Sequence, residues 1–241
     1  LWAENFRPEF FNPWRCDDWH MPILESVDAK PNALYDFRKV KSCIRYEVSR
    51  SGKAVHFFSQ KQAEKLWNTP EWYLRWLTQF DYVVSPCYHT MNAALPVWWF
   101  QTYRNRLMGQ YLHRNGVNVI PSVRWGEEET FAIAFRGLPR NSTLAVSSVG
   151  YEGTEWLYQE GIDYLCKNYQ PNRFVVLGGD LGADYGGVET ICFEDDRANE
   201  DAGQKTWHEQ MNTTLYNPWQ TDHIGMPLMK RTDKIPTELL G

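Results

Sequence analysis

Cysteine, histidine and acidic side chains cluster directly after short apolar segments of the chain. Cys87 and His89 follow the apolar run Tyr82–Ser85. A thiolate beside an imidazole is a nucleophile, and the same two groups bind zinc. Residues two apart on a loop need not touch, however, and the sequence supplies no third group that orients them. A partly buried, unreactive thiol is therefore the commoner explanation of Cys87.

Two carboxylates also follow apolar runs that are predicted strands. Glu127 follows the apolar run Val117–Val123, and Asp180 lies in the glycine-rich stretch GGDLGADYGG after Phe174–Leu177. Carboxylates supply general acids and bases, or oxygen ligands for a hard metal ion. The glycine-rich stretch matches neither GxGxxG opening a helix nor a P-loop, so it predicts a turn. The catalytic candidates are Cys87, His89, Glu127 and Asp180.

A zinc site is the other chemistry that these residue types suggest. Its candidate ligands are Cys16, His20, Cys87 and His89, which lack the paired close spacing of structural zinc sites. The sequence therefore assigns no metal and leaves any cofactor unknown.

The elements that position these side chains alternate between strand and helix. Nearly continuous apolar runs predict strands at Ala54–Ser59, Tyr82–Ser85, Val117–Val123, Thr143–Val149 and Phe174–Leu177, with a weaker strand at Ser42–Val48. Such runs are typical of a parallel sheet covered by helices on both faces. The helix from Pro96 to Asn115 is expected to turn VWWF inward and Arg104 and Arg106 outward.

The predicted fold class is α/β with a mostly parallel sheet built from repeated βα units. An open doubly wound sheet and a partial or small TIM-type barrel both satisfy this pattern. The barrel-like arrangement is favoured, because the loops after the strands are long and polar while those before them are tight. In either architecture, ligands bind at the carboxyl ends of the strands. The ligand-binding candidates are therefore His56, Ser85, Arg124, Trp125, Ser147, Gly178 and Gly179.

Three regions follow from these patterns. Residues 1–41 are expected to form an N-terminal arm with turns, and residues 42–193 the α/β domain. Residues 194–241 form an acidic, polar tail whose aromatic residues predict docking on the domain or on a neighbouring chain. Because the first residue is Leu1, the chain is expected to be processed or part of a longer protein.

Composition narrows the classes of partner. The net charge of −5 does not favour a broad nucleic-acid-binding face, although a local basic patch remains compatible with it. Five scattered cysteines without a CxxC pair indicate reduced thiols and a cytoplasmic location, and no apolar run is long enough to cross a membrane. Aromatic residues make up 15% of the chain, which suits a large core and also oligomer or protein-assembly surfaces.

Several motifs in order resemble a known family. They are WRCDDWHMP, KLWNTPEWYL, FDYVVSPCY, FQTYRNRLMGQYL, GVNVIPSVRWG and STLAVSSVG, covering roughly Asn12 to Gly179. The family they resemble is a domain of unknown function found in bacteriophages and in mobile elements of bacteria. The resemblance implies a phage or mobile-element context and no established catalytic residues.

Two functions follow as expectations. The first is binding or processing of a nucleotide, nucleic acid or related small ligand at the carboxyl ends of the strands. The second is a non-enzymatic interaction or assembly protein that uses aromatic-rich surfaces and the tail. Whether the chain is an enzyme stays open at this stage.

Overall fold

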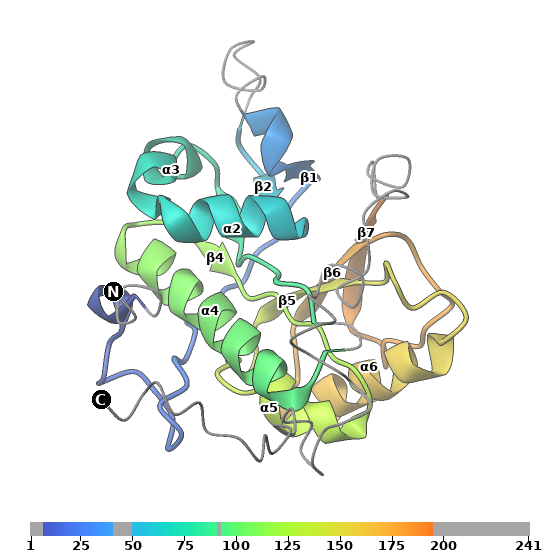
Figure 1. Cartoon of the computed structure of the whole chain (residues 1–241). Helices are drawn as coiled ribbons and strands as arrows, with labels where there is room; N and C mark the ends of the chain where they lie inside the picture. The colour runs from blue at the N-terminus through green and yellow to red at the C-terminus, as the bar shows by residue number, and fades with distance from the viewer. Residues whose placement is uncertain (1–6, 41–49, 91–92, 195–241) are drawn as a thin grey trace, which may run out of the picture.

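The computed structural model describes residues 7–40, 50–90 and 93–194 (Figure 1). The expected strand at Ser42–Val48 and the polar tail from residue 195 onward lie outside these residues. Within them, no helix is long and apolar enough to cross a membrane.

The strands form two parallel sheets, which confirms the predicted α/β class. The first sheet has the order β1 (Ala33–Asp36), β2 (Lys53–His56), β3 (Tyr82–Val84), β4 (Val119–Ile120). The second has the order β5 (Thr143–Ser147), β6 (Arg173–Leu177), β7 (Glu189–Phe193). All pairs are parallel, and the strands lie in the order in which the chain makes them.

The chain just after β4 joins the two sheets. Ser122 forms an isolated parallel bridge with Ala145 of β5. The Ala145 amide donates to the Pro121 carbonyl at 2.8 Å, and the Val123 amide donates to the Ala145 carbonyl at 3.0 Å. The backbone hydrogen bonding therefore passes from the first sheet into the second.

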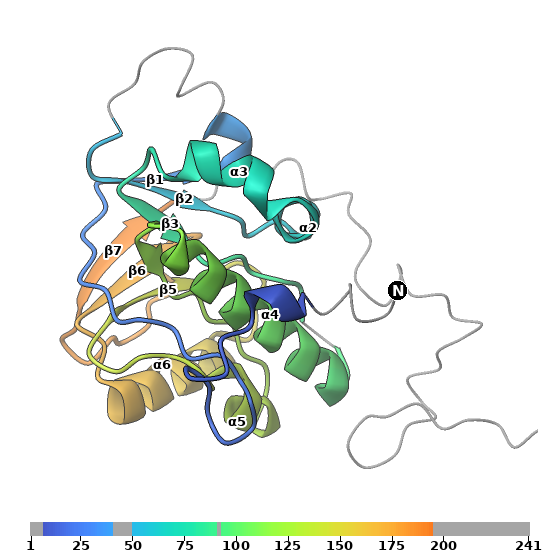
Figure 2. The same cartoon turned by 90° about the vertical axis from the view of Figure 1, so that its left-hand side faces the viewer.

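Helices cover the outer faces of both sheets (Figures 1 and 2). The longer ones are α2 (Gln60–Asn68), α3 (Pro70–Leu77), α4 (Leu95–Arg114) and α6 (Glu155–Tyr169), with a short α5 (Phe131–Ala134). The residues that the structure describes also include the 3-10 turns η2 (Pro8–Phe10), η3 (Phe37–Lys39) and η4 (Glu128–Thr130). The first three helices pack on the first sheet, and α6 packs on the second.

Alternate strand residues face two environments, and both are apolar. Val55 and Val83 pack in a cluster with residues of α2, α3 and α4, and Phe174 packs in a cluster with α6. The opposite faces share a third cluster, to which Ala54 and Val175 belong. Burial on both faces explains why the strands are continuous apolar runs in the sequence.

The sequence does not predict β1 or β7. β1 lies inside the stretch expected to be an arm, and it pairs along its whole length with β2. Both are outer strands of their sheets, and β7 is half-exposed, so neither carries the long apolar run of a central strand. The first sheet therefore begins within the residues assigned to the arm.

The orientation of α4 also differs from the prediction. Arg104 and Arg106 are 5% and 1% exposed, whereas Phe100 of the VWWF block is 36% exposed. Both arginines are buried because α4 lies between the first sheet, α2, α5 and the N-terminal segment. Arg104 reaches α2, where it donates to both carboxylate oxygens of Glu64.

Arg106 is buried among neutral acceptors. Its guanidinium donates to the carbonyls of Ser122 (2.9 Å), Ala134 (2.7 Å) and Arg136 (2.7 Å), and to the side chain of Asn105. Burial lowers the pKa of Arg106 to about 10, so the group keeps its charge at neutral pH. One side chain thus connects α4, α5 and the chain between the two sheets.

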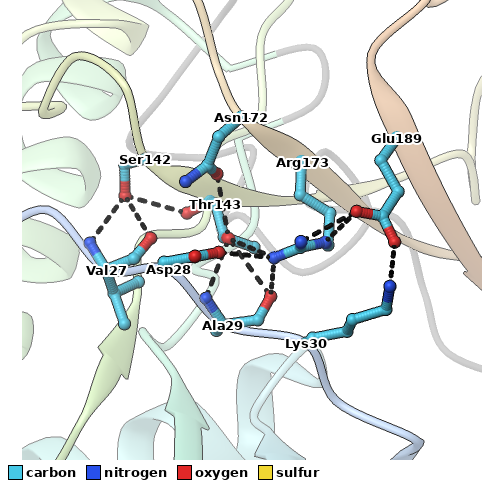
Figure 3. Close-up of polar contacts among 9 residues, drawn as sticks. All are labelled: Val27, Asp28, Ala29, Lys30, Ser142, Thr143, Asn172, Arg173 and Glu189. Carbon is cyan, nitrogen blue, oxygen red and sulfur yellow. Dashed lines mark hydrogen bonds and ion pairs between the residues drawn. The ribbon is translucent and has the colours of Figure 1, made fainter.

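A strap formed by residues 27–30 crosses the amino ends of the second sheet (Figure 3). The Thr143 amide donates to the Val27 carbonyl at 2.8 Å, and the Ala29 amide donates to the Thr143 hydroxyl at 3.0 Å. Arg173, the first residue of β6, donates to the Ala29 carbonyl at 2.8 Å.

Ion pairs extend this crossing to β7. Arg173 pairs with Asp28 at 2.7 Å and with Glu189 at 2.8 Å, and Lys30 also pairs with Glu189 at 2.6 Å. Glu189 begins β7, and Lys30 comes shortly before β1. The strap therefore contacts the first residues of β5, β6 and β7 (Figure 3).

We predict that Arg106→Lys destabilises the fold although it keeps the charge. A lysine ammonium cannot reproduce the planar fork that reaches acceptors on three segments, and each buried acceptor left unpaired costs about 1–3 kcal/mol. Urea unfolding should therefore show a loss of at least about 1 kcal/mol. The matched control is Arg140→Lys at an exposed position, expected within about 0.5 kcal/mol of the native chain. Equal stability of the two variants would contradict this role of Arg106.

Candidate functional site

A buried polar network lies at the carboxyl ends of β3 and β4. The Ser122 amide donates to the Ser85 hydroxyl at 2.8 Å, and the Ser122 hydroxyl donates to the Ser85 carbonyl at 2.8 Å. Asn105 of α4 donates to the Pro86 carbonyl and to the Ser122 hydroxyl, both at 2.8 Å. The network fixes the loop after β3 against α4 and against the junction of the two sheets.

A cleft of about 280 Å³, counting its opening to solvent, lies beside this network. Its enclosed part has room for about one water molecule. The loop after β3, the chain after β4, α4 and α5 all contribute to its wall. The lining residues are Cys87, Tyr88, Thr90, Trp98, Gln101, Thr102, Asn105, Arg106, Ser122, Val123, Arg124 and Ala134. Two of them are arginines, and none of these described lining residues is a carboxylate.

Three polar atoms of the lining residues are buried without a hydrogen-bond partner. They are the Tyr88 hydroxyl, the Thr90 hydroxyl and Nε of Arg124. All three can donate a hydrogen bond, and an unpaired buried donor costs about 1–3 kcal/mol. Burial raises the pKa of Tyr88, so its hydroxyl keeps its proton. Three donors of the cleft's lining residues are therefore unpaired, beside two arginine side chains.

Arg124 connects this cleft to the next strand. Its guanidinium donates to the Val149 carbonyl after β5, and it lies 5.9 Å from the centre of the Tyr151 ring. The Tyr151 hydroxyl in turn donates to the Trp125 carbonyl at 2.6 Å. These contacts hold the guanidinium of Arg124 in place while its Nε stays unpaired.

His89 lies within electrostatic range of Arg124. Burial lowers the pKa of His89, and the positive charge of Arg124 lowers it further. The imidazole is therefore neutral at pH 7. The His89 backbone amide donates to the side chain of Gln60 at 2.7 Å, which ties the loop after β3 to the start of α2.

The structure brings together only some of the residues that the sequence nominates. Ser85, Cys87 and Arg124 lie at the network or the cleft, with Cys87 5% exposed in the cleft wall. Asp180 is exposed and accepts hydrogen bonds from the amides of Gly182 and Ala183, so it stabilises its own turn. The Glu127 carbonyl accepts from Thr130 at the start of η4. Neither carboxylate lines the cleft.

Trp125 belongs to the core. It is 1% exposed, its indole N–H donates to the Leu157 carbonyl at 3.0 Å, and its ring stacks on Tyr158. A Cβ at Gly161 of α6 would lie 2.0 Å from the Trp125 ring, so glycine is required for this close approach. Trp125 therefore anchors the chain next to Arg124 in the core, and it does not line the cleft.

The remaining ligand candidates lie further along the same edge. Ser147 is 4% exposed and its hydroxyl accepts from the Val149 amide at 3.3 Å. Gly178 has a φ of 106°, and a Cβ there would lie 2.7 Å from the Ser148 hydroxyl. Gly179 has a φ of 89° with no atom near its missing Cβ. None of the three lines the cleft.

His56 has a neighbour that the sequence did not reveal. Asp36 is its register partner across β1 and β2, and the two side chains are 4% and 3% exposed. Burial alone would raise the pKa of Asp36, but hydrogen bonds from Arg38 and the charge of His56 hold it below its usual value. Gln62 also donates to Asp36 at 3.0 Å. This carboxylate was missed because β1 was expected to be part of the arm.

Polar residues of α4 were missed as well. Gln101 and Asn105, like Thr102 and Arg106, lie four residues apart and so occupy one face of the helix. All four line the cleft. The spacing of these four residues in the sequence could have predicted a polar face of α4.

The zinc candidates fall in separate surroundings. Cys16 and His20 lie in a turn of the N-terminal segment, with Sγ 3.9 Å from Nδ1. Across residues 7–40, 50–90 and 93–194, no group of three or more His, Cys, Asp or Glu side chains is placed to hold a metal ion.

Replacing Arg124 should change the titration of His89. In Arg124→Gln the electrostatic part of the depression disappears, so the pKa of His89 rises toward its usual value of 6.5. His113 serves as the internal control, because its pKa is lowered by burial and by Arg15. Imidazole signals followed by NMR against pH measure both residues. An unchanged His89 titration would show that Arg124 does not act on it.

The lowered pKa of His89 also makes the stability of the folded chain depend on pH. Because the folded-state pKa of His89 lies below 6.5, the unfolded chain takes up this proton first as the pH falls. The contribution of the neutral imidazole to stability is therefore lost as the pH drops below about 6.5.

Comparison with known proteins identifies the family of this chain. A family model described as Domain of unknown function (DUF4417) matches residues 15–190. The Gene 1 protein of Mycobacterium phage L5 is 29% identical over 167 residues, covering 66% of this chain and 71% of that protein. The Gene 1 protein of Mycobacterium phage D29 is 30% identical over 135 residues, covering 53% of this chain and 49% of that protein. No solved structure matches. The chain therefore belongs to the DUF4417 family, which confirms the resemblance to a family of unknown function found in bacteriophages.

Proposed function

We propose that this domain binds a small ligand through an anionic group, such as the phosphate of a nucleotide, in the cleft at the carboxyl ends of β3 and β4. The observation that carries the proposal is the set of unpaired donors from Tyr88, Thr90 and Arg124 around one cleft. A phosphate or carboxylate accepts several hydrogen bonds from such donors, and charge-assisted bonds of this kind are strong.

The electrostatics of the cleft favour the same class of ligand. Arg106 and Arg124 both contribute to its wall, and the described lining residues include no competing carboxylate. Arg106 already donates to four acceptors, so its role toward a ligand is a fixed positive charge. Arg124 has an unpaired Nε and supplies a direct contact.

We further infer that the array of strands is barrel-like, which gives the cleft its position. The inner cluster includes residues from every described strand, among them Leu34 of β1 and Phe193 of β7. The Lys30–Glu189 ion pair supports an approach of the outer strands. In barrels of this type ligands bind at the carboxyl end, which is where the cleft lies.

Of the two residues nominated as a nucleophile and its base, Cys87 lines the cleft and His89 does not. The Cys87 side chain lies in the cleft wall, and the neutral His89 lies within electrostatic range of Arg124. We assign ligand binding to this cleft, in which the ligand would contact the side chain of Cys87.

An interaction or assembly role is the second candidate. Three tryptophans are prominently exposed: Trp14 at 92%, Trp19 at 60% and Trp156 at 58%. Exposed tryptophans are enriched at protein interfaces. Analytical ultracentrifugation of the full chain distinguishes this role: a concentration-dependent oligomer that Trp14→Ser or Trp156→Ser weakens supports it. A monomer at all concentrations argues against self-assembly.

The ligand proposal predicts opposite effects of Thr90→Val on stability and on binding. Valine removes the unpaired hydroxyl at nearly constant volume, so the free protein should gain up to about 1 kcal/mol in stability. The same change removes a ligand contact, so affinity for adenosine monophosphate should fall. Urea unfolding and calorimetric titration measure the two effects.

Arg124→Gln tests whether the positive charge of Arg124 contributes to ligand binding. It should weaken binding of adenosine monophosphate at least about tenfold, the usual effect of a lost charge-assisted hydrogen bond. Adenosine, which lacks the phosphate, provides the matched ligand, and exposed Arg140→Gln provides the matched variant. Equal affinity for the nucleoside and the nucleotide, or equal loss in both variants, would refute an anion site in this cleft.

A further inference from the structure

A second cavity lies on the other half of α4, between that helix and the N-terminal segment. Its volume is about 490 Å³ counting its opening to solvent, and water-sized molecules have about 190 Å³ of room within it. Its lining residues are Asn12, Arg15, Ile23, Glu25, Gln110, His113 and Arg114. The cleft described above involves α4 residues from Trp98 to Arg106, so the two cavities share no lining residue. We refer to the second cavity as the arm groove.

The frame of the arm groove is fixed by hydrogen bonds to backbone atoms. The Gln110 side chain donates to the carbonyls of Arg15 (2.6 Å) and Ile23 (2.9 Å). One turn further along the helix, Arg114 donates to the Phe10 carbonyl at 3.1 Å. These hydrogen bonds fix the position of the N-terminal segment relative to α4.

Basic side chains outnumber acidic ones in this groove. Arg15, His113 and Arg114 line it, and Glu25 is the carboxylate among the described lining residues. Glu25 pairs with Arg15, whose side chain is still 51% exposed. Arg15 is thus held in position by Glu25 but remains accessible.

Two further features of the groove concern Gln110 and His113. Gln110 is 6% exposed, and its Oε1 is buried without a partner because its amide nitrogen is used on the two carbonyls. His113 lies close enough to Arg15 that the positive charge adds to burial in lowering the pKa of its imidazole. An anion between them would reverse this repulsion.

We propose that the arm groove is a second anion site, in which Arg15, His113 and Arg114 bind the phosphate of a small hydroxylated phosphate ester. The volume accommodates a phosphate together with a few carbon atoms, and a ligand hydroxyl is the kind of donor that Gln110 Oε1 lacks. Because the groove shares no lining residue with the cleft, evidence against binding in the cleft would not count against this site.

The decisive experiment compares two substitutions on the same ion pair. Arg15→Gln removes the accessible cation and should lower the affinity for glycerol 3-phosphate at least tenfold. Glu25→Gln removes the carboxylate that competes for Arg15 and should raise the affinity several-fold. A purely structural ion pair predicts that both changes act in the same direction, so opposite signs identify a binding role. Calorimetric titration of the full chain measures both.

Further arms of the experiment separate this site from the cleft and identify the source of the phosphate. Arg124→Gln should leave glycerol phosphate binding in the groove unchanged, and the pKa of His113 should rise when the ester binds. Arg15 and Glu25 from the N-terminal segment and Arg114 from its own helix are the charged groups in the groove that surround this imidazole.

A short single-stranded oligonucleotide serves as the second probe. If it displaces the ester from the native chain but not from Arg15→Gln, a nucleic-acid phosphate is the source. If it does not compete, a small phosphate ester is the source, and either result supports the anion site. Absence of saturable binding by both probes, or equal binding by the native chain and Arg15→Gln, overturns the proposal.

Discussion

A buried guanidinium without a carboxylate partner constrains the centre of this molecule. Arg106 is 1% exposed, and it is stabilised by three backbone carbonyls and one amide oxygen that come from different segments. Burying a charge is costly unless its donors are all satisfied, so these segments must meet at fixed positions around it. One of the carbonyls belongs to Ser122, the residue that bridges the two sheets. The requirement to satisfy Arg106 therefore fixes where the first sheet passes into the second.

The cleft depends on the same junction. Ser122 also bonds to Ser85 and to Asn105, so the loop after β3, α4 and the sheet junction form one hydrogen-bonded unit. At the opposite end of the strands, the strap performs a related role by connecting β5, β6 and β7 through Thr143, Arg173 and Glu189 (Figure 3). At the carboxyl ends, by contrast, the side chains of Tyr88, Thr90 and Arg124 retain polar atoms without a hydrogen-bond partner.

The sequence predicted the central strands well, because burial on both faces leaves an apolar run that has no other simple explanation. It predicted Ser85, Cys87 and Arg124 as members of one edge for the same reason: parallel strands place their carboxyl ends together. It failed for Asp36, since β1 is a short outer strand whose four residues include a tyrosine and an aspartate. It failed for Arg104 and Arg106, because sequence periodicity cannot tell an exposed charge from one whose partners come from distant segments.

The proposed anion site depends on a contrast between Arg106 and Arg124. Both are partly or fully buried beside the same space, yet every nitrogen of Arg106 has an acceptor while Nε of Arg124 has none. The neighbouring Tyr88 and Thr90 hydroxyls repeat the same deficit, and so does Nε of Arg104, whose other nitrogens pair with Glu64. Three such deficits around one cleft lower the stability of the free protein, and an anion that accepts from all three would recover it. Under the proposed function a ligand would satisfy the three donors of the cleft lining, whereas Nε of Arg104 and the indole nitrogen of Trp76, which are also unpaired, belong to residues that do not line the cleft.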